Sequence, residues 1–320
     1  MRNRGLLLWG SLVLVLLVGG CAEQPVAPPV EKEKQAAPAP PPPYRPPVAI
    51  LVSADIPAYT DVADRLQERL GQRASRFFVS NTSDALQALS PEISQRGQIA
   101  AIGLEAAVAA KPLAQAGRSV VFCQVFNYSQ DELLSERSKG VGMLPSYREL
   151  FAVWHGLAPE LRRVAVFTGP GLDTMLAPAV KEASRYGIDL MPITVNSDKE
   201  FIYSYKRSGA RYDGLWLIPD NRVLSRTAIR EVMSFSLRNG KQVAVFNDQL
   251  LSLGGLLSVT SKPDEIASKV TQRLAAARPS GQIDGPDIIN LRQAVVRINP
   301  VVAQRFTLTI PQRLQRYVVR

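Results

Sequence analysis

The sequence of 320 residues has little of the chemistry on which metal sites and covalent catalysis depend. It holds one histidine, His155, and two cysteines, Cys21 and Cys123. Zinc sites use clusters of Cys and His, and a cysteine nucleophile needs a histidine partner, so this scarcity argues against both. No phosphate-binding glycine loop and no nucleophile-elbow motif is present. We therefore expect no enzyme, no cofactor and no bound metal, with a hydrolase as the least favoured alternative.

Long apolar runs are also absent, except for one at the start. Arg2 and Arg4 precede an apolar stretch over residues 5–18, which is shorter than the roughly 20 residues of a membrane-spanning helix. Gly19, Gly20 and Cys21 follow, and this ending resembles a bacterial lipobox. The resemblance implies a lipoprotein signal peptide at 1–20 and a lipid such as palmitate on Cys21. The alternatives are an ordinary secretory signal and an uncleaved anchor helix.

Residues 21–47 are rich in proline and cannot form a core. Such a segment favours extended polyproline II, in which about 3.1 Å per residue gives a reach on the order of 70 Å. We interpret it as a stalk between the lipidated Cys21 and a folded body. A proline-motif ligand for a partner protein is the alternative.

The composition is that of a soluble globular protein, and the full chain has a formal net charge of +10, of which Arg2 and Arg4 leave with the predicted signal peptide. The basic residues are scattered, apart from Arg305, Arg313, Arg316 and Arg320 near the end of the chain, and an exported protein is not expected to bind nucleic acid. Anionic envelope surfaces match the charge better, and a merely solvated basic face is the alternative. With Cys21 lipidated, Cys123 has no disulfide partner in the mature chain. It lies in an apolar run, which predicts a buried strand thiol.

From residue 48 onward, short apolar segments alternate with amphipathic ones, which predicts an α/β fold with parallel sheets covered on both faces. Predicted strands are 48–52, 74–79, 98–102, 120–125, 163–167, 189–195, 214–218, 242–246 and 287–298. Predicted helices are 61–70, 83–89, 147–157, 176–186, 225–239 and 264–278, and a helix is also expected directly after Gly103. Ser83 and Asp61 are expected as N-caps, and Gly240 as a helix stop.

Three segments of this pattern resemble a known family. They are the stretch 98–103, the stretch 212–221 and the C-terminal pair 288–294 and 308–311. They are similar to the periplasmic substrate-binding lipoproteins of ABC transporters, of the tryptophan-binding-like type. The resemblance implies a type I periplasmic-binding-protein architecture: two Rossmann-like lobes with three crossovers between them. It places the first lobe at 48–143 plus 254–283, and the second at 144–253 plus 284–320.

In such an architecture a small molecule binds between the lobes, beyond the carboxyl ends of the strands. For an amino-acid-like ligand the family expectation is a carboxylate held by backbone amides and hydroxyls, with an acidic residue near the amine. Polar and aromatic residues that follow predicted strands are the candidates: Asp220, Asn221, Asn247, Asp248, Asn127, Tyr128, Thr168 and Tyr59. An Asx turn or helix cap is the alternative for Asp220 and Asn221, and a core or surface side chain is the alternative for Tyr59.

The sequence also departs from the family pattern. Leu104 and Glu105 stand where the family often has Thr-Pro, so a hydroxyl is lost and a carboxylate is placed near a helix N-terminus. Asn127 and Tyr128 replace a common Asp-Pro pair, and 258–263 lacks the usual tyrosines. These departures predict a binding shell retuned to another ligand, or lost.

The sequence therefore predicts an extracytoplasmic solute-binding lipoprotein that presents a small molecule to an ABC permease. The alternative is an envelope scaffold or sensor on the same fold, with a degenerate cleft, acting through protein contacts. Ala22 bears on the choice, because Asp at this position favours inner-membrane retention in the lipoprotein resemblance and Ala does not. An outer-membrane anchor facing the periplasm is therefore expected.

Overall fold

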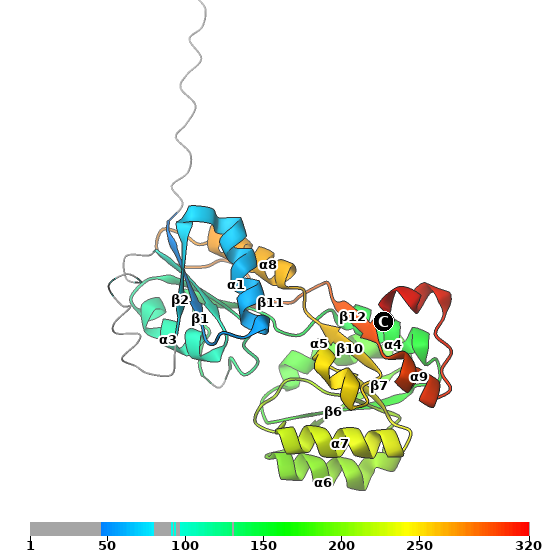
Figure 1. Ribbon diagram of the computed structural model, residues 1–320. Helices are drawn as coiled ribbons and strands as arrows, with labels where there is room; N and C mark the ends of the chain where they lie inside the picture. The colour runs from blue at the N-terminus through cyan, green and yellow to red at the C-terminus, as the bar shows by residue number, and fades with distance from the viewer. Residues whose placement is uncertain (1–45, 80–90, 92, 94–96, 130, 320) are drawn as a thin grey trace, which may run out of the picture. The chain divides into compact units, whose positions relative to one another are not determined.

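The computed structural model describes residues 46–79, 91, 93, 97–129 and 131–319, and Figure 1 shows their arrangement. The predicted signal peptide 1–20, most of the stalk 21–47, the helix 83–89 and its cap Ser83 lie outside these residues. Residues 45–320 form one compact unit. Among the described residues, no helix has the length and apolar character needed to cross a bilayer.

The first lobe is built on a six-stranded sheet in which all pairs are parallel. Its strands, in spatial order, are β11 (Ile288–Ile289), β5 (Ser138–Val141), β4 (Ser119–Cys123), β3 (Gln98–Ile102), β1 (Val48–Val52) and β2 (Ala74–Phe78). β1, β3 and β4 are buried along their whole length because helices cover both faces. α1 (Pro57–Leu70) and α8 (Pro263–Ala275) pack on one face, and α3 (Leu104–Gln115) packs on the other.

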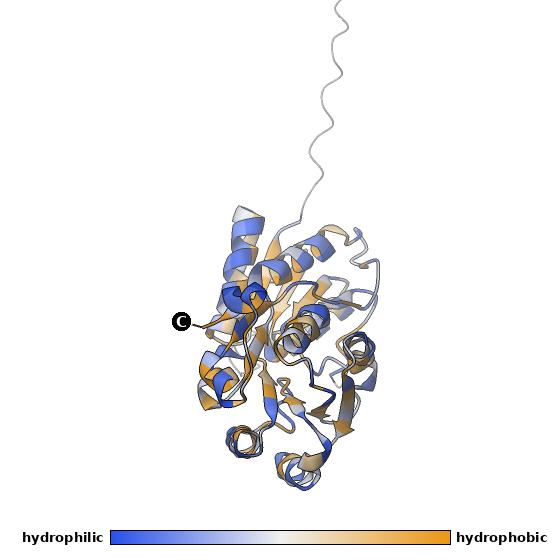
Figure 2. Cartoon of the chain, turned by 90° about the vertical axis from the view of Figure 1, so that its right-hand side faces the viewer, coloured by the Kyte–Doolittle hydropathy of each residue, from blue (hydrophilic) through white to orange (hydrophobic). Residues whose placement is uncertain are grey.

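The second lobe is a six-stranded sheet with one antiparallel edge, where β12 pairs with β10. Its strands, in spatial order, are β12 (Val295–Ile298), β10 (Leu257–Thr260), β9 (Gln242–Val245), β8 (Gly214–Trp216), β6 (Arg163–Thr168) and β7 (Asp189–Thr194). The helices are α4 (Tyr147–Leu157), α5 (Asp173–Ser184) and α9 (Pro300–Arg305) on one face, and α6 (Asp198–Ser208) and α7 (Arg226–Arg238) on the other. In Figure 2 the strands are largely orange, while the surrounding helices carry both colours.

The predicted α/β fold with two parallel-sheet lobes is confirmed, and several local predictions need correction. The N-cap at Asp61 is wrong, because α1 begins four residues earlier at Pro57, whose fixed φ suits the first turn of a helix. The strand predicted over 287–298 is two short strands, β11 and β12, in different sheets. The helix stop at Gly240 is confirmed, since this glycine has φ +66° directly after the C-cap of α7.

The chain crosses between the lobes three times, after β5, after β10 and after β11. β10 pairs with β9 in the second sheet and β11 pairs with β5 in the first. The first lobe therefore holds residues 46–143 and 261–291, and the second holds 144–260 and 292–320. The second and third crossings thus lie about eight residues later than the boundaries 253/254 and 283/284 expected from the family resemblance.

Hydrogen bonds join the three crossings to one another. The Ser261 hydroxyl donates to the backbone oxygen of Met143 at 2.6 Å. The buried carboxylate of Glu265 accepts the backbone N–H groups of Arg292 and Gln293 at 2.8 and 2.9 Å. Each crossing is therefore held to a neighbouring crossing by at least one hydrogen bond.

Candidate functional site

The carboxyl ends of the parallel strands β1 and β3 lie side by side in the first lobe, where Gly103 forms the turn from β3 into α3. Ser53 follows β1, and its hydroxyl accepts the backbone N–H of Ala106 in the first turn of α3 at 2.9 Å. Gly103 lies against it with φ +89°, and a Cβ there would stand 2.5 Å from the Ser53 hydroxyl oxygen. The turn therefore requires glycine both for its backbone conformation and for space.

Tyr59 is brought to the same edge by the first turn of α1. Its ring lies beside Gly103, 3.0 Å from where a Cβ would stand. Burial raises the pKa of the Tyr59 phenol, and the nearby Glu105 and Cys123 raise it further. Tyr59 is therefore a half-buried neutral phenol close to the exposed carboxylate of Glu105.

The loop after β4 carries two further predicted residues. It begins at Gln124, whose φ of +56° is uncommon for a residue with a side chain and whose amide donates to the Ala58 oxygen at 3.1 Å. Tyr128 packs on Phe122 with 6.0 Å between ring centroids, and burial followed by the charge of Asp287 raises its pKa. The loop is thus fixed at both ends by specific contacts.

Asp220 follows β8 in the second lobe and is fully buried. Its carboxylate accepts the backbone N–H of Gly169 at 2.8 Å and the Arg222 Nε and Nη2 groups at 2.8 and 2.7 Å. It also accepts the Arg222 backbone N–H at 3.2 Å, which is an Asx turn. Burial alone would raise the pKa of Asp220, but the bonds from Arg222 and Gly169 outweigh it and lower the pKa.

The Asp220 carboxylate is therefore engaged inside the protein by the neighbouring loops. Arg222 also donates through Nη1 to the Pro170 oxygen at 2.8 Å. A Cβ at Gly169 would stand 2.7 Å from the Arg222 guanidinium carbon, so the ion pair requires glycine at this point of the chain. The pair fastens the loop after β6 to the loop after β8.

Asn127 and Asn221 are brought together from different lobes. The Asn127 amide donates to the Asn221 side-chain oxygen at 3.3 Å. Asn127 is 7% exposed, and its own side-chain oxygen is buried without a hydrogen-bond partner among the described residues. An orphaned buried acceptor costs about 1–3 kcal/mol, so this position is suited to a donor supplied from outside the chain.

Asn247 and Asp248 serve the local structure after β9. Asn247 caps the 3-10 helix η3 (Asp248–Leu253) by accepting the backbone N–H of Gln249 at 2.9 Å. Asp248 pairs with Arg297 at 2.6 Å and accepts the Ser258 hydroxyl. Asp248 also lines a hollow of about 360 Å³ with residues of η3, β12 and the C-terminal segment.

Thr168 is the last residue of β6 and is buried. Its carbonyl accepts the backbone N–H of Val195 at 2.8 Å. It directly precedes Gly169, the residue that bonds Asp220. Thr168 therefore lies beside the loops that the Asp220–Arg222 pair fastens.

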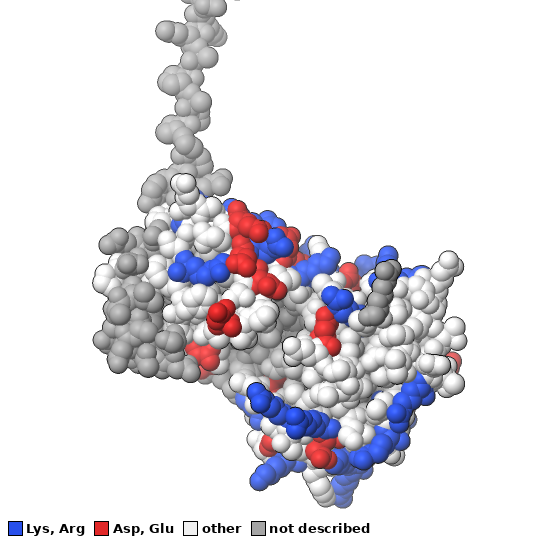
Figure 3. All heavy atoms as spheres, viewed as in Figure 1, with Lys and Arg blue, Asp and Glu red and all other residues white. Residues whose placement is uncertain are grey.

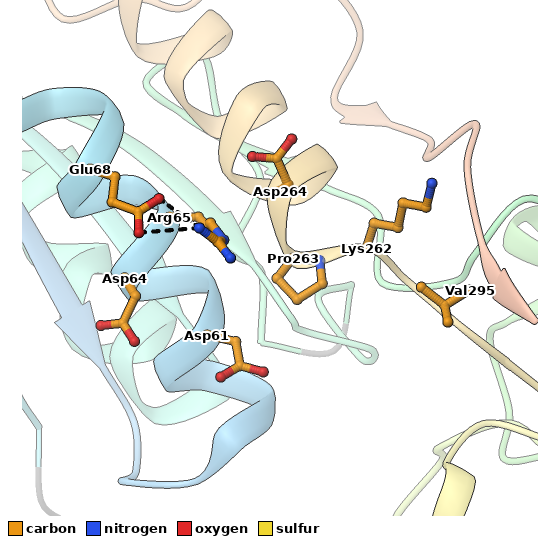
Figure 4. Close-up of a pocket in the computed structure, with 8 residues that line it drawn as sticks. All are labelled: Asp61, Asp64, Arg65, Glu68, Lys262, Pro263, Asp264 and Val295. Atoms are coloured by element: carbon orange, nitrogen blue, oxygen red, sulfur yellow. Dashed lines mark hydrogen bonds and ion pairs between the residues drawn. The ribbon is translucent and has the colours of Figure 1, made fainter. Parts of the chain in front are cut away.

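A larger hollow of about 460 Å³ lies between α1 and the start of α8 (Figure 4). None of the eight predicted site residues lines it. Its charged lining residues have both signs, with Asp61, Asp64, Glu68 and Asp264 set against Arg65 and Lys262. In the described part of the chain no group of His, Cys, Asp and Glu is arranged to hold a metal ion.

The two residues considered for catalysis are in structural positions. Cys123 is 1% exposed, and burial raises its pKa to about 12, so it is a neutral thiol. His155 lies in α4 and packs against Tyr186 with 6.2 Å between ring centroids. Within the described ranges, neither makes a hydrogen bond to a group that would activate it for nucleophilic chemistry.

Sequence reasoning did not identify Ser53, Gln124 or Arg222. Ser53 and Gln124 have a usable signal, since each comes at the end of a predicted strand on the edge where ligands bind. Arg222 has none, because its role depends on the loop after β6, which lies 51 residues away from Asp220 in sequence.

Similarity to solved structures supports the fold at low sequence identity. No protein-family model and no curated protein sequence matches the chain. An ABC domain from Streptococcus pneumonia in complex with L-Trp is 17% identical with a TM-score of 0.60, covering 86% of this chain and 100% of that one. A conserved domain protein from Vibrio cholerae is 17% identical with a TM-score of 0.59, covering 86% and 99%.

A third structure is a ligand-free, open substrate-binding protein with adhesive properties from Clostridium difficile. It is 15% identical with a TM-score of 0.61, and the match covers 86% of this chain and 99% of that one. The similarity therefore extends over nearly the whole of each known structure. The predicted resemblance to type I periplasmic binding proteins is confirmed as a shared fold.

Proposed function

We propose that this chain is an extracytoplasmic solute-binding protein that captures a small, amino-acid-like molecule between its lobes for an ABC importer. The unpartnered side-chain oxygen of Asn127 carries this proposal, because it lies beside the hydrogen bond that joins the two lobes. A ligand donor at this point would satisfy a buried acceptor and contact both lobes. Ligand binding would then favour the closed arrangement.

In this proposal the residues around Asn127 supply the rest of the site. Asn221 contacts the ligand from the second lobe, with Thr168 nearby, and Tyr128 and Tyr59 supply aromatic surface. Asp220 does not hold the ligand amine, because its carboxylate already accepts four hydrogen bonds. Glu105, exposed near Tyr59, is the proposed partner of the ligand ammonium group.

A thermal-shift screen of residues 45–320 tests the proposal. The library pairs each amino acid with the carboxylic acid that lacks its amino group, and adds nucleosides and small sugars. A true ligand at about 100 times its Kd stabilises the protein by about 2.7 kcal/mol. We expect an amino acid to give this shift and its amine-free analogue to give a smaller one. A library in which no compound shifts the transition would contradict the proposal.

The alternative function is an envelope scaffold or sensor that acts through protein contacts. The internal use of Asp220 and Asp248 favours it, since both acidic residues among the eight candidates are engaged in holding loops. The screen separates the two functions. A scaffold keeps its thermal transition unchanged in the presence of every small molecule.

We further propose that Cys21 carries the lipid anchor, in the outer membrane. Cys21→Ser is expected to abolish incorporation of labelled palmitate. Cys123→Ser is the matched control, because Cys123 is buried and has no route to acylation. Palmitate labelling that persists in Cys21→Ser would exclude this anchor.

A further inference from the structure

The excess positive charge of the folded body is confined to the second lobe. Residues 144–260 and 292–320 contain 20 Lys and Arg against 11 Asp and Glu, whereas residues 46–143 and 261–291 contain 13 against 14. In Figure 3 Lys and Arg gather over the part of the molecule where α6 and α7 lie in Figure 1. The helices α6 and α7 contribute six Lys and Arg against three Asp and Glu to this excess, and residues 292–320 contribute six Arg and no Asp or Glu.

The helices α6 and α7 lie side by side and run in the same direction. Asp198 in the first turn of α6 accepts the hydroxyl of Ser225, the N-cap of α7, at 2.6 Å. Further along, Lys206 of α6 pairs with Glu231 of α7 at 2.5 Å. The two helices are thereby tied at two points and present a continuous outer surface.

Each helix carries a row of three exposed residues spaced four or eight positions apart in the sequence. This spacing places the three residues of a row on the same side of their helix. The rows, which we call the basic face, are Lys199, Tyr203 and Arg207 on α6 and Arg226, Arg230 and Arg238 on α7. Among the described residues no carboxylate lies within ion-pair distance of the three α7 arginines. The acidic groups beside this face, Asp198 and Glu231, are engaged with Ser225 and Lys206.

An aromatic ring lies among these cations. Tyr203 is 60% exposed, and the Arg207 guanidinium stands 5.8 Å from its ring centroid and donates to its hydroxyl at 2.9 Å. A tyrosine with an apolar ring and a polar tip is the side chain that settles at the headgroup level of a bilayer. An exposed aromatic ring among cationic side chains distinguishes the basic face from a basic surface that is only solvated.

We propose that the basic face binds the surface of an anionic lipid bilayer. Each Lys or Arg near such a surface contributes about 1 kcal/mol of binding free energy. The contributions of the three α7 arginines therefore add up to about 3 kcal/mol. This attachment is separate from solute capture and from the lipid on Cys21. It would hold the second lobe against a membrane that the anchor alone only tethers.

Vesicle flotation with residues 45–320 tests this inference without the anchor, because this unit contains both sheets and their cores. We expect flotation with phosphatidylcholine vesicles that contain about a third phosphatidylglycerol at about 0.1 M salt. We expect none with pure phosphatidylcholine, and release at about 0.5 M salt, where screening is strong. The triple variant Arg226→Glu, Arg230→Glu, Arg238→Glu should lower binding at least about tenfold.

The control is the triple variant Lys111→Glu, Lys269→Glu, Arg278→Glu, which makes the same change in net charge. These three residues belong to the first lobe and lie outside the basic face. It should keep most of the binding. Equal loss in both triple variants would overturn the inference, because net charge rather than this face would then govern binding. Absence of flotation with anionic vesicles would also overturn it, in favour of an acidic protein partner or a solvated surface.

Discussion

Replacing Asp220 by Asn is expected to lower the free energy of unfolding of residues 45–320 by about 3 kcal/mol at neutral pH. The change leaves the Arg222 guanidinium without its counter-charge in a region where only 19% of that side chain is exposed. Removing one partner of a buried ion pair costs about 3–5 kcal/mol, and the remaining access of Arg222 to water places the effect at the lower end. Urea denaturation measures the difference.

The stability difference between wild type and Asp220→Asn should become smaller as the pH falls. Hydrogen bonds from Arg222 and Gly169 hold the pKa of Asp220 below its ordinary value, so the native state favours the ionised form. Its stabilisation is therefore full above the unfolded pKa of about 4 and is lost as pH falls through the lower native pKa. The gap between wild type and Asp220→Asn should be constant from about pH 5 to 8 and shrink below about pH 4.

Asp213→Asn is the matched control for this prediction. Asp213 pairs with Arg163 at 3.0 Å, but both side chains are substantially exposed, so its loss should cost about 1 kcal/mol or less. If Asp220→Asn instead left stability unchanged and altered only ligand affinity, Asp220 would be a ligand anchor. The Arg222 pair would then be dispensable to the fold.

Replacing Trp154 by Ala is expected to cost about 3–5 kcal/mol of unfolding free energy. Trp154 is fully buried in the core between α4 and the second sheet, and its indole N–H donates to the Gln242 side-chain oxygen at 2.8 Å. The variant loses this packing and leaves a polar group unpartnered. Gly214 lies against the ring, where a Cβ would be 3.0 Å from it. Because glycine has no side chain, nothing at this position can move into the cavity that Trp154→Ala leaves.

Val301→Ala provides the comparison for Trp154→Ala. Val301 lies in α9 of the same lobe and is 72% exposed, so its truncation should change stability by less than about 0.5 kcal/mol. A loss below about 1 kcal/mol in Trp154→Ala would contradict the packing described for the second lobe. It would mean that α4 is not part of the main core.

The fold could be predicted because apolar periodicity records burial directly. β1, β3 and β4 are continuous apolar runs buried on both faces, and the helix predicted over 147–157 is α4. β5 reads Ser-Lys-Gly-Val and carries almost no apolar signal, since Gly140 makes room for Phe122 and Ile288. That strand was therefore missed, and the division of 287–298 between two sheets has no local signature.

The places of the candidate residues along the chain relative to the strands could be predicted, whereas their hydrogen-bond partners could not. Seven of the eight candidates come after strands and Thr168 is the last residue of β6, and Asn127 and Asn221 meet from different lobes. The role of Asp220 depends on Gly169 in the loop after β6, and the role of Asp248 depends on Arg297 of β12, so both are set by tertiary structure. A carboxylate that anchors a ligand and one that anchors a loop look alike in the sequence. Only their hydrogen-bond partners distinguish them.

Solute capture between the lobes is tested most directly by calorimetric titration of the compound that gives the largest thermal shift. Wild type is compared with Asn127→Leu, Asn221→Leu and Asn239→Leu. Asn239 is exposed and caps the far end of α7, at the opposite edge of the second sheet. We predict that Kd rises at least about tenfold, or about 1.4 kcal/mol, in the first two variants and stays unchanged in the third. An unchanged Kd in both Asn127→Leu and Asn221→Leu would contradict binding between the lobes.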